Sequence, residues 1–425
     1  MRSRFSDLRS GSTTIGPAAG SLPPHQWSAV IQYLTADELK ALRLAGSKAM
    51  HLTDPSLTNH LQLRMDKAPF FLDHDDFAVS QAKEWLANRR RLVMNDASLN
   101  ICSRRVAYLA ANRYMNSVSE IVIYDCHRHR NIVGLLEQLP NLESLRLASY
   151  TGDQEEGVRD ELELLVESVG KLYSLKKLDV EFDCIIHGSR LSFLQHLQGL
   201  KHLRLRGFDL SDGITSLGGL KDLTNLHLCH GNFYSSPIND VNERDLINLM
   251  GLTNLKEVHL EGFDSLSEVG LKAFSTIPTS IDHLALKHCQ DLNQGCLQSI
   301  GRMTHLKSLH FVHSACDEVQ LFDAQDVRQL NALVALKSLS LFYVLEDPSD
   351  LRVLCGLTSL ETLNLALEDG IHQEDIEGLC QTSPAFRSLK KLRIFSEDCM
   401  EHSYRHGNLE IEFLKFAFGD LVHLE

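Results

Sequence analysis

A short apolar motif recurs along most of this chain and limits what it can fold into. The motif has apolar residues at its first, fourth and sixth positions, and successive copies begin 23 to 33 residues apart. Its eleven copies are VSEIVI at 118, LESLRL at 142, LKKLDV at 175, LKHLRL at 200, LTNLHL at 223, LKEVHL at 255, IDHLAL at 281, LKSLHF at 306, LKSLSL at 336, LETLNL at 360 and LKKLRI at 389. Such periodic self-similarity is the signature of a repeat architecture.

Each copy has the alternation of a short strand that buries one face. One unit cannot bury that face alone, so neighbouring units must stack into a curved solenoid with a parallel sheet. The segments 160–170, 267–277 and 326–336 carry apolar residues at helical spacing. We therefore expect an α/β solenoid with the sheet on its concave side and mostly helices on its convex side.

These units resemble the leucine-rich repeat, of the ribonuclease-inhibitor-like or cysteine-containing type. The units at 255–277 and 281–301 are the most similar to the cysteine-containing family. Cys126 and Cys289 occupy the ninth position of their units, where that family buries a Cys or Asn. The other units mostly lack this residue, so the similarity to the subtype is partial.

The segment before the repeats reads as a small helical module. Trp27, Val30, Ile31 and Leu34 have the spacing of one helical face, after Pro23 and Pro24 at a helix start. Thr35 and Glu38 then form a capping-box pattern for a second helix.

This module resembles the F-box through Leu22-Pro23, Val30-Ile31, Leu34, Leu42-Arg43 and Asp54-Pro55. It departs from that family at His25, where an acidic residue is usual, and at Lys48-Ala49-Met50, which follows Ser47 in place of Arg-Trp. The resemblance implies docking on a Skp-type adaptor of a cullin–RING ligase. The implied adaptor-binding residues are Leu22, Pro23, Trp27, Val30, Ile31, Leu34, Leu39 and Leu42.

We expect four regions: a disordered tail at 1–20, the F-box-like module at 21–66, a linker and capping unit at 67–117, and the solenoid at 118–425. The solenoid has eleven units and an incomplete twelfth that starts at Leu421. Two alternatives stay open: the Arg- and Ser-rich tail has the composition of a transit peptide, and the incomplete unit is either a stub or a truncation.

Composition removes several classes of function. A net charge of -14 disfavours a general nucleic-acid binder, and no apolar run is long enough to span a membrane. The ten cysteines form no CxxC pair, which disfavours a disulfide framework and a zinc site. No motif for catalysis, metal or cofactor is present. We expect a non-enzymatic cytoplasmic or nuclear protein.

The third, fifth and seventh positions of each unit should project from the concave face. They hold seven cations, five anions and five of the 21 histidines. We expect this face to bind an acidic or phosphorylated protein segment at a basic, His-rich centre with an apolar shoulder. The predicted partner-binding residues are His202, Arg204, Arg206, His227, His259, His283, Lys287, His310 and Phe342.

Together, an F-box-like module followed by leucine-rich repeats implies the substrate-recognition subunit of an SCF-type ubiquitin ligase. In that family the F-box binds the adaptor and the solenoid holds the substrate. The alternative is a stand-alone leucine-rich-repeat scaffold in which a degenerate F-box acts only as a cap.

Overall fold

The structure is a computed structural model of residues 1–425. It describes two short strands at 63–64 and 91–94 and most of residues 116–395. The longer gaps within that last range are 151–156, 231–240, 242–245, 277–280, 314–320 and 367–388, and the others span one to three residues.

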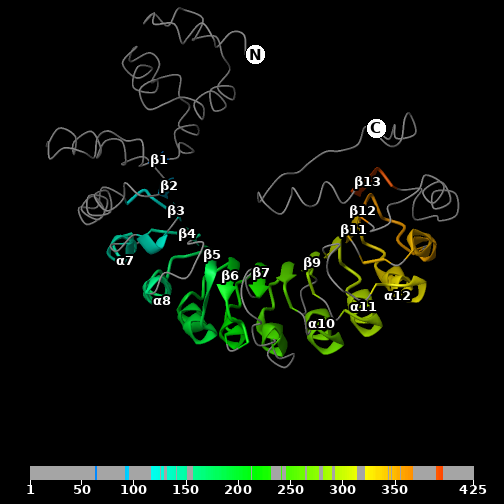
Figure 1. Cartoon of the computed structure of the whole chain (residues 1–425), viewed down its shortest axis with the longest axis horizontal. Coiled ribbons are helices and arrows are strands. Elements are labelled where there is room, and N and C mark those ends of the chain that lie inside the picture. The colour runs from blue at the N-terminus through cyan, green and yellow to red at the C-terminus, as the bar shows by residue number, and fades with distance from the viewer. Residues whose placement is uncertain are drawn as a thin grey trace, which may run out of the picture.

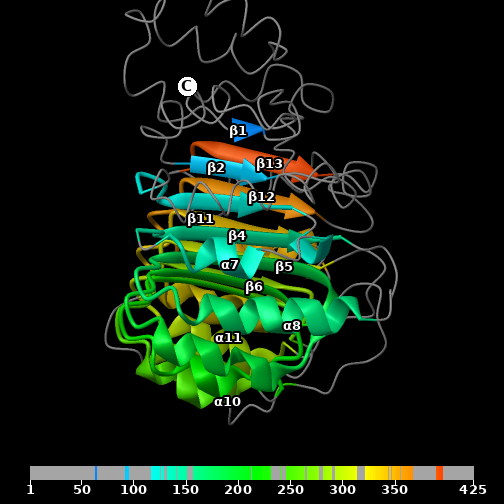
Figure 2. The same ribbon diagram turned by 90° about the vertical axis from the view of Figure 1, so that its left-hand side faces the viewer.

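A single parallel sheet forms the inner wall of an arc (Figure 1). Its 13 strands are hydrogen-bonded in sequence order, and all their arrows point the same way (Figure 2). The strands are β1 (Leu63–Arg64), β2 (Arg91–Met94), β3 (Glu120–Ile123), β4 (Ser144–Ser149), β5 (Lys177–Ile186), β6 (His202–Phe208), β7 (Asn225–His230), β8 (Glu257–Glu261), β9 (His283–Lys287), β10 (Ser308–Val312), β11 (Ser338–Phe342), β12 (Thr362–Ala366) and β13 (Lys391–Phe395).

Strands β3 to β13 each begin at the third residue of a repeated motif. Residues at the same position of successive units are register partners, as for Leu203 with Leu226 and Arg204 with His227. The hydrogen bonding between neighbouring units extends to the residues just before the strands, since the amides of Lys201 and His202 both donate to the Lys176 carbonyl, at 2.8 and 3.0 Å. The register therefore places equivalent side chains in rows across the sheet.

The return segments are short helices on the outer side of the arc (Figure 1). The α-helices are α7 (Ile132–Leu136), α8 (Val158–Val169), α10 (Glu268–Ser275), α11 (Gln294–Gly301) and α12 (Ala324–Arg328). The 3-10 helices are η6 (Cys126–Arg128), η7 (Gly188–His196), η8 (Ile214–Leu217), η9 (Ile247–Gly251), η10 (Gln329–Ala332) and η11 (Pro348–Val353). The predicted α/β solenoid with a concave parallel sheet is confirmed.

The core lies between the sheet and these helices. The leucines of the repeated motif are almost all fully buried, for example Leu200, Leu203 and Leu205 at 0 to 2% exposure. Such leucine burial is the main stabilising contribution, at about 1.5–3 kcal/mol for each side chain. Cys126 and Cys289 are buried, as expected.

The eighth position of three central units has a left-handed backbone. Gly207 and Gly262 have φ of 84° and 73°, and His288 has φ of 51°. A Cβ on Gly207 would lie 2.4 Å from the Phe182 carbonyl oxygen, so a side chain would collide with the neighbouring strand. Gly207 and Gly262 directly follow Arg206 and Glu261, and they turn the chain where these two side chains leave the sheet.

Two predicted features lie outside the residues that the structure describes, and one predicted helical segment contains a strand. The adaptor-binding residues Leu22 to Leu42 and the incomplete unit at Leu421 lie outside the described residues. Leu63 and Arg64, which fall within the segment predicted to be a helical module, instead pair with Leu92 and Val93 as a strand. The edge of the sheet supplies hydrogen-bond partners there, so the sheet begins two strands before the first repeated motif, with β2 inside the segment predicted to be a capping unit.

Candidate functional site on the concave face

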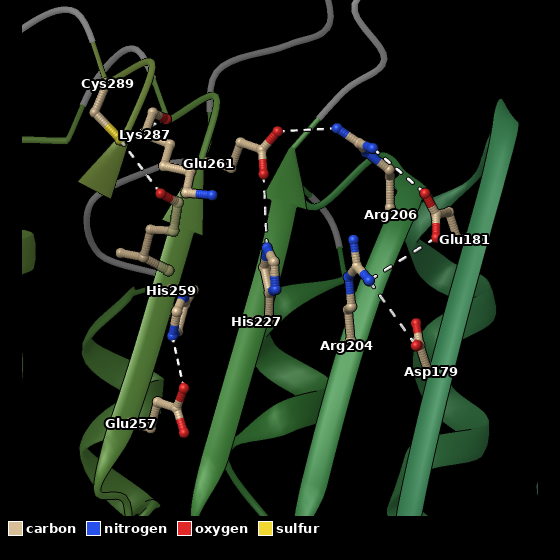
Figure 3. Close-up of polar contacts among 11 residues, drawn as sticks. Asp179, Glu181, Arg204, Arg206, His227, Glu257, His259, Glu261, Lys287 and Cys289 are labelled. Carbon is tan, nitrogen blue, oxygen red and sulfur yellow. Dashed lines mark hydrogen bonds and ion pairs between the residues drawn. The ribbon is translucent and has the colours of Figure 1, made fainter. Parts of the chain in front are cut away.

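Polar side chains cover the middle of the concave face, on the neighbouring strands β4 to β8. Figure 3 shows those of β5 to β8. We call the whole set the concave centre. It consists of Arg146, Asp179, Glu181, Arg204, Arg206, His227, Glu257, His259 and Glu261. All of them occupy the third, fifth or seventh position of a unit, while the fourth and sixth positions are buried.

Three arginines share two carboxylates of β5. Arg146 lies 3.1 Å from Glu181 and 3.5 Å from Asp179. Arg206 lies 3.5 Å from the other oxygen of Glu181. Arg204, between them, approaches Asp179 and Glu181 only to 3.9 Å. Burial raises the pKa of Asp179, although the charges of Arg204 and Arg146 oppose this shift.

Glu261 joins the arginines to the histidines. Its Oε1 accepts a hydrogen bond from Arg206 at 2.9 Å, and its Oε2 lies 3.6 Å from Nε2 of His227 (Figure 3). Burial alone would raise the pKa of this carboxyl, but His227, Arg206 and Lys287 together lower it to about 2. Glu261 therefore stays ionised and fixes the positions of both partners.

His227 and His259 form a stacked pair on β7 and β8, with ring centroids 5.2 Å apart. His259 is hydrogen-bonded to Glu257 at 2.8 Å, and the Asn225 amide donates to the other oxygen of Glu257. Burial lowers the pKa of His259, so the ring is largely neutral at pH 7. This part of the concave centre offers fixed hydrogen-bonding groups rather than positive charge.

A shallow depression of about 220 Å³ lies among these residues. Its floor consists of core leucines, and its walls are polar. The polar lining is Lys177, Asp179, His202, Arg204, Asn225, His227, Glu257 and His259. Burial also lowers the pKa of His202. The depression therefore has three imidazoles beside two cations and two anions, and burial favours the neutral forms of His202 and His259.

These contacts refine the expectation of a basic centre. The concave positions of β4 to β9 hold five cations and four anions, and the two β5 carboxylates lie within 4 Å of the arginines. His202 and His259 contribute little charge at pH 7, because burial favours their neutral forms. The surface is nearly balanced in charge and rich in oriented donors.

A second polar cluster lies nearer the C-terminal end of the arc, on β10 to β12. We call it the serine–histidine ladder, and it consists of Ser308, His310, Ser340 and Asn364. His310 is hydrogen-bonded to Ser308 through Nε2 and to Ser340 through Nδ1, both at 2.7 Å. The Asn364 amide donates to Ser340 at 2.8 Å. Burial lowers the pKa of His310 to about 4, which makes the ring a weak general base.

The structure brings together some of the predicted partner-binding residues and leaves others apart. His202, Arg204, Arg206, His227 and His259 come together in or beside the concave centre, while His310 belongs to the ladder. His283 is an exposed side chain on β9, Lys287 contributes to the low pKa of Glu261, and Phe342 is half-buried on β11. That these residues bind a partner stays a prediction.

The acidic side chains of the concave centre are functional candidates that the partner-binding prediction omits. Asp179 and Glu181 are the register partners of Arg204 and Arg206, and Glu261 is the partner of Cys229. The repeat itself carries this signal, because residues at equal positions in successive units become neighbours. Cys229 is also buried here, and burial raises its pKa to about 12, so its thiol stays protonated.

Two negative findings apply to the part of the chain that the structure describes. It contains no group of three or more His, Cys, Asp or Glu side chains placed to hold a metal ion. None of its helices has the length and apolarity that crossing a membrane would require.

Comparison with known proteins identifies similar folds only. No family model matches the chain, and no curated protein matches it. Among solved structures, 174 chains match. A leucine-rich-repeat protein of Leptospira interrogans is 15% identical over 82% of this chain and 98% of its own, with a TM-score of 0.38. TLR13, in its complex with ssRNA13, is 19% identical over 73% of this chain and 44% of its own, with a TM-score of 0.42.

Proposed function

We propose that this chain is a recognition protein that binds a segment of a partner protein across its concave centre. The observation that carries this proposal is the depression on β5 to β8, which places polar donors of fixed orientation around an open floor. A leucine-rich-repeat solenoid supports such a role in general, since its curvature creates an extended binding surface. Side chains held by ion pairs lose little further freedom on binding.

The finer proposal is that the chain is the substrate-recognition subunit of a cullin–RING ubiquitin ligase. It is supported by the F-box-like residues of segment 21–66, which precede the solenoid in the order typical of such receptors. In this account Leu22, Trp27 and Ile31 contact a Skp-type adaptor, and the concave centre holds the substrate.

A second function is favoured by one observation on the N-terminal edge of the sheet. Leu63 and Arg64 lie inside segment 21–66 and pair with β2. A segment continuous with the sheet can act as a cap that protects the first strand. The chain would then be a scaffold that binds partners without delivering them to a ligase.

Co-purification with a Skp-type adaptor distinguishes the two functions. Trp27→Asp and Ile31→Asp each place a charge in the proposed adaptor interface, so we expect the complex to be lost. Leu164→Asp is the matched control, because Leu164 is 63% exposed on α8. If the native chain forms no complex with the adaptor, or if both variants retain the complex, the receptor function is contradicted and the scaffold function is favoured.

The concave face has its own test. The triple variant Arg204→Ala, Arg206→Ala and His227→Ala removes three side chains of the concave centre. We expect it to lose its ubiquitylated client proteins while it still binds the adaptor. Lys391→Ala with Arg393→Ala is the control on β13, at the far end of the same face. Unchanged clients in the triple variant would contradict the proposed surface.

A further inference from the structure

The two arginines of β6 differ in how fully the protein itself uses them. Arg206 donates to Glu261 at 2.9 Å and also contacts Glu181 at 3.5 Å, and its side chain is 25% exposed. Arg204 makes two contacts with described residues, to Asp179 and Glu181, and both are 3.9 Å long. A distance of 3.9 Å is an ion pair but too long for a hydrogen bond, whose donor–acceptor distance is about 2.7–3.2 Å.

Most donors of Arg204 therefore lack an acceptor among the described residues. Both of its long contacts use Nη1. Its Nε is buried and has no hydrogen-bond partner in the described part of the chain. A guanidinium has five N–H donors in a planar fork that matches a carboxylate. Leaving such donors unpaired costs free energy, which an incoming acceptor would recover.

Arg204 also lines the depression, and the rest of that lining indicates what kind of acceptor fits. Lys177, an exposed cation at the third position of β5, is on the same wall. Asp179 and Glu257 add two negative charges to the lining. With two cations and two anions, the lining has no excess positive charge that would favour a doubly charged phosphate over a single carboxylate.

We propose that Arg204 anchors a single carboxylate, an aspartate or glutamate side chain of an extended partner segment, in this depression. The inference rests on the proposed recognition function and names the chemistry of its site. His202 and His227 flank the carboxylate as hydrogen-bonding groups. Arg206 takes no part in this contact, since it already connects Glu181 and Glu261.

The length of the guanidinium contacts explains why Arg204 can turn toward a ligand. Releasing the two 3.9 Å ion pairs breaks no hydrogen bond, and Asp179 keeps its 3.5 Å contact with Arg146. Moving Arg206 away would remove a hydrogen-bond donor from the carboxylate of Glu261, whose low pKa keeps it ionised. The same residue type thus has a binding role at the fifth position and a structural role at the seventh.

The test is selection from a displayed library of random linear peptides on the full-length chain and on Arg204→Gln. We expect the native chain to enrich peptides with Asp or Glu at one fixed position and Arg204→Gln to lose that preference. Arg393→Gln, the same change on β13, should keep it. Thermal melting of each variant establishes that it is folded.

The outcomes separate this inference from the function on which it rests. The Arg204 anchor is contradicted if the enriched peptides share no fixed acidic residue, or if Arg204→Gln still selects that residue. Recognition of a peptide segment by the concave face would be unaffected by either result. No enriched peptide on the native chain would overturn recognition of an extended segment, and the anchor with it.

A synthetic peptide from the selection then tests the ligand chemistry. Replacing its Glu by Gln should weaken binding to the native chain about tenfold or more, and binding to Arg204→Gln less than about twofold. Phosphoserine at that position should bind no better than Glu. Phosphoserine binding about tenfold tighter than Glu would replace the carboxylate by a phosphate as the ligand of Arg204.

Discussion

The concave centre and the serine–histidine ladder occupy the same positions of the same sheet, yet their chemistry differs. In the concave centre, arginines of β4 and β6 lie within 4 Å of carboxylates of β5 and β8. In the ladder, Ser308, His310, Ser340 and Asn364 form one chain of short hydrogen bonds among neutral groups. The backbone register and the buried leucines are alike in both regions.

This difference shows that, in the solenoid, one set of positions stabilises the fold and another set determines the chemistry of the concave surface. Positions four and six are buried in each unit from β3 to β12, so positions three, five and seven can vary without changing the fold. The ladder uses its donors internally, whereas the concave centre retains a guanidinium with unused donors at Arg204. We therefore expect the two regions to respond alike to changes in the core and differently to changes on the surface.

The largest effect should be the same in both regions. Leu228→Ala on β7 and Leu341→Ala on β11 each remove a fully buried side chain. We expect each to lower the free energy of unfolding by about 3 kcal/mol, measured by urea denaturation. A difference between the two of more than about 2 kcal/mol would show that the core is not equivalent along the arc.

The arginine pair should show the contrast within the concave centre. Arg206→Gln leaves Glu261 without its 2.9 Å donor, so we expect a loss of about 2 kcal/mol in the free energy of unfolding. Arg204→Gln breaks only two 3.9 Å contacts and should cost less than about 0.5 kcal/mol. Equal losses for the two variants would mean that Arg204 is as structural as Arg206.

The two regions should also lose stability in different pH ranges. The pKa of His310 falls from 6.5 to about 4 on folding, so its contribution is complete above pH 6.5 and is lost as the pH falls toward 4. The pKa of Glu261 falls from 4.5 to about 2, so its contribution is complete above pH 4.5 and is lost toward pH 2. Each contribution is on the order of 2 kcal/mol after allowance for solvent screening.

Two variants isolate these titrations in urea denaturation across pH. His310→Gln should flatten the dependence on pH between 6.5 and 4 and leave the lower range as it is. Glu261→Gln should act only between 4.5 and 2. If both variants changed the same range, the two clusters would not be electrostatically separate.

The smallest effect concerns a single hydroxyl of the ladder. Ser340→Ala removes the acceptor of Asn364 and one partner of His310. We expect it to lower the free energy of unfolding by about 1 kcal/mol and to leave peptide binding unchanged. Weaker peptide binding by this variant would extend the recognition surface from the concave centre into the ladder.

The spacing of the apolar motif was enough to predict the fold, because periodic leucines have one way to be buried together. The sequence also placed Arg204, Arg206 and His227 on the concave face. It did not show that Glu181 and Glu261 neutralise Arg206, since that depends on side-chain rotamers and on distances across β5 to β8. The strand at Leu63–Arg64 was not predicted, because two residues are too few to show the alternation of apolar and polar residues that indicates a strand.

Site-specific photocrosslinking tests the central claim, that the partner segment lies on the concave centre, most directly. Asn225 on β7 and Ser338 on β11 occupy the same third position, four strands apart, and a photoreactive residue is introduced at each in turn. We expect a selected acidic peptide to crosslink at Asn225 and Arg204→Gln to abolish this crosslink. Crosslinking at Ser338 alone, or a crosslink at Asn225 that Arg204→Gln leaves intact, would contradict this claim.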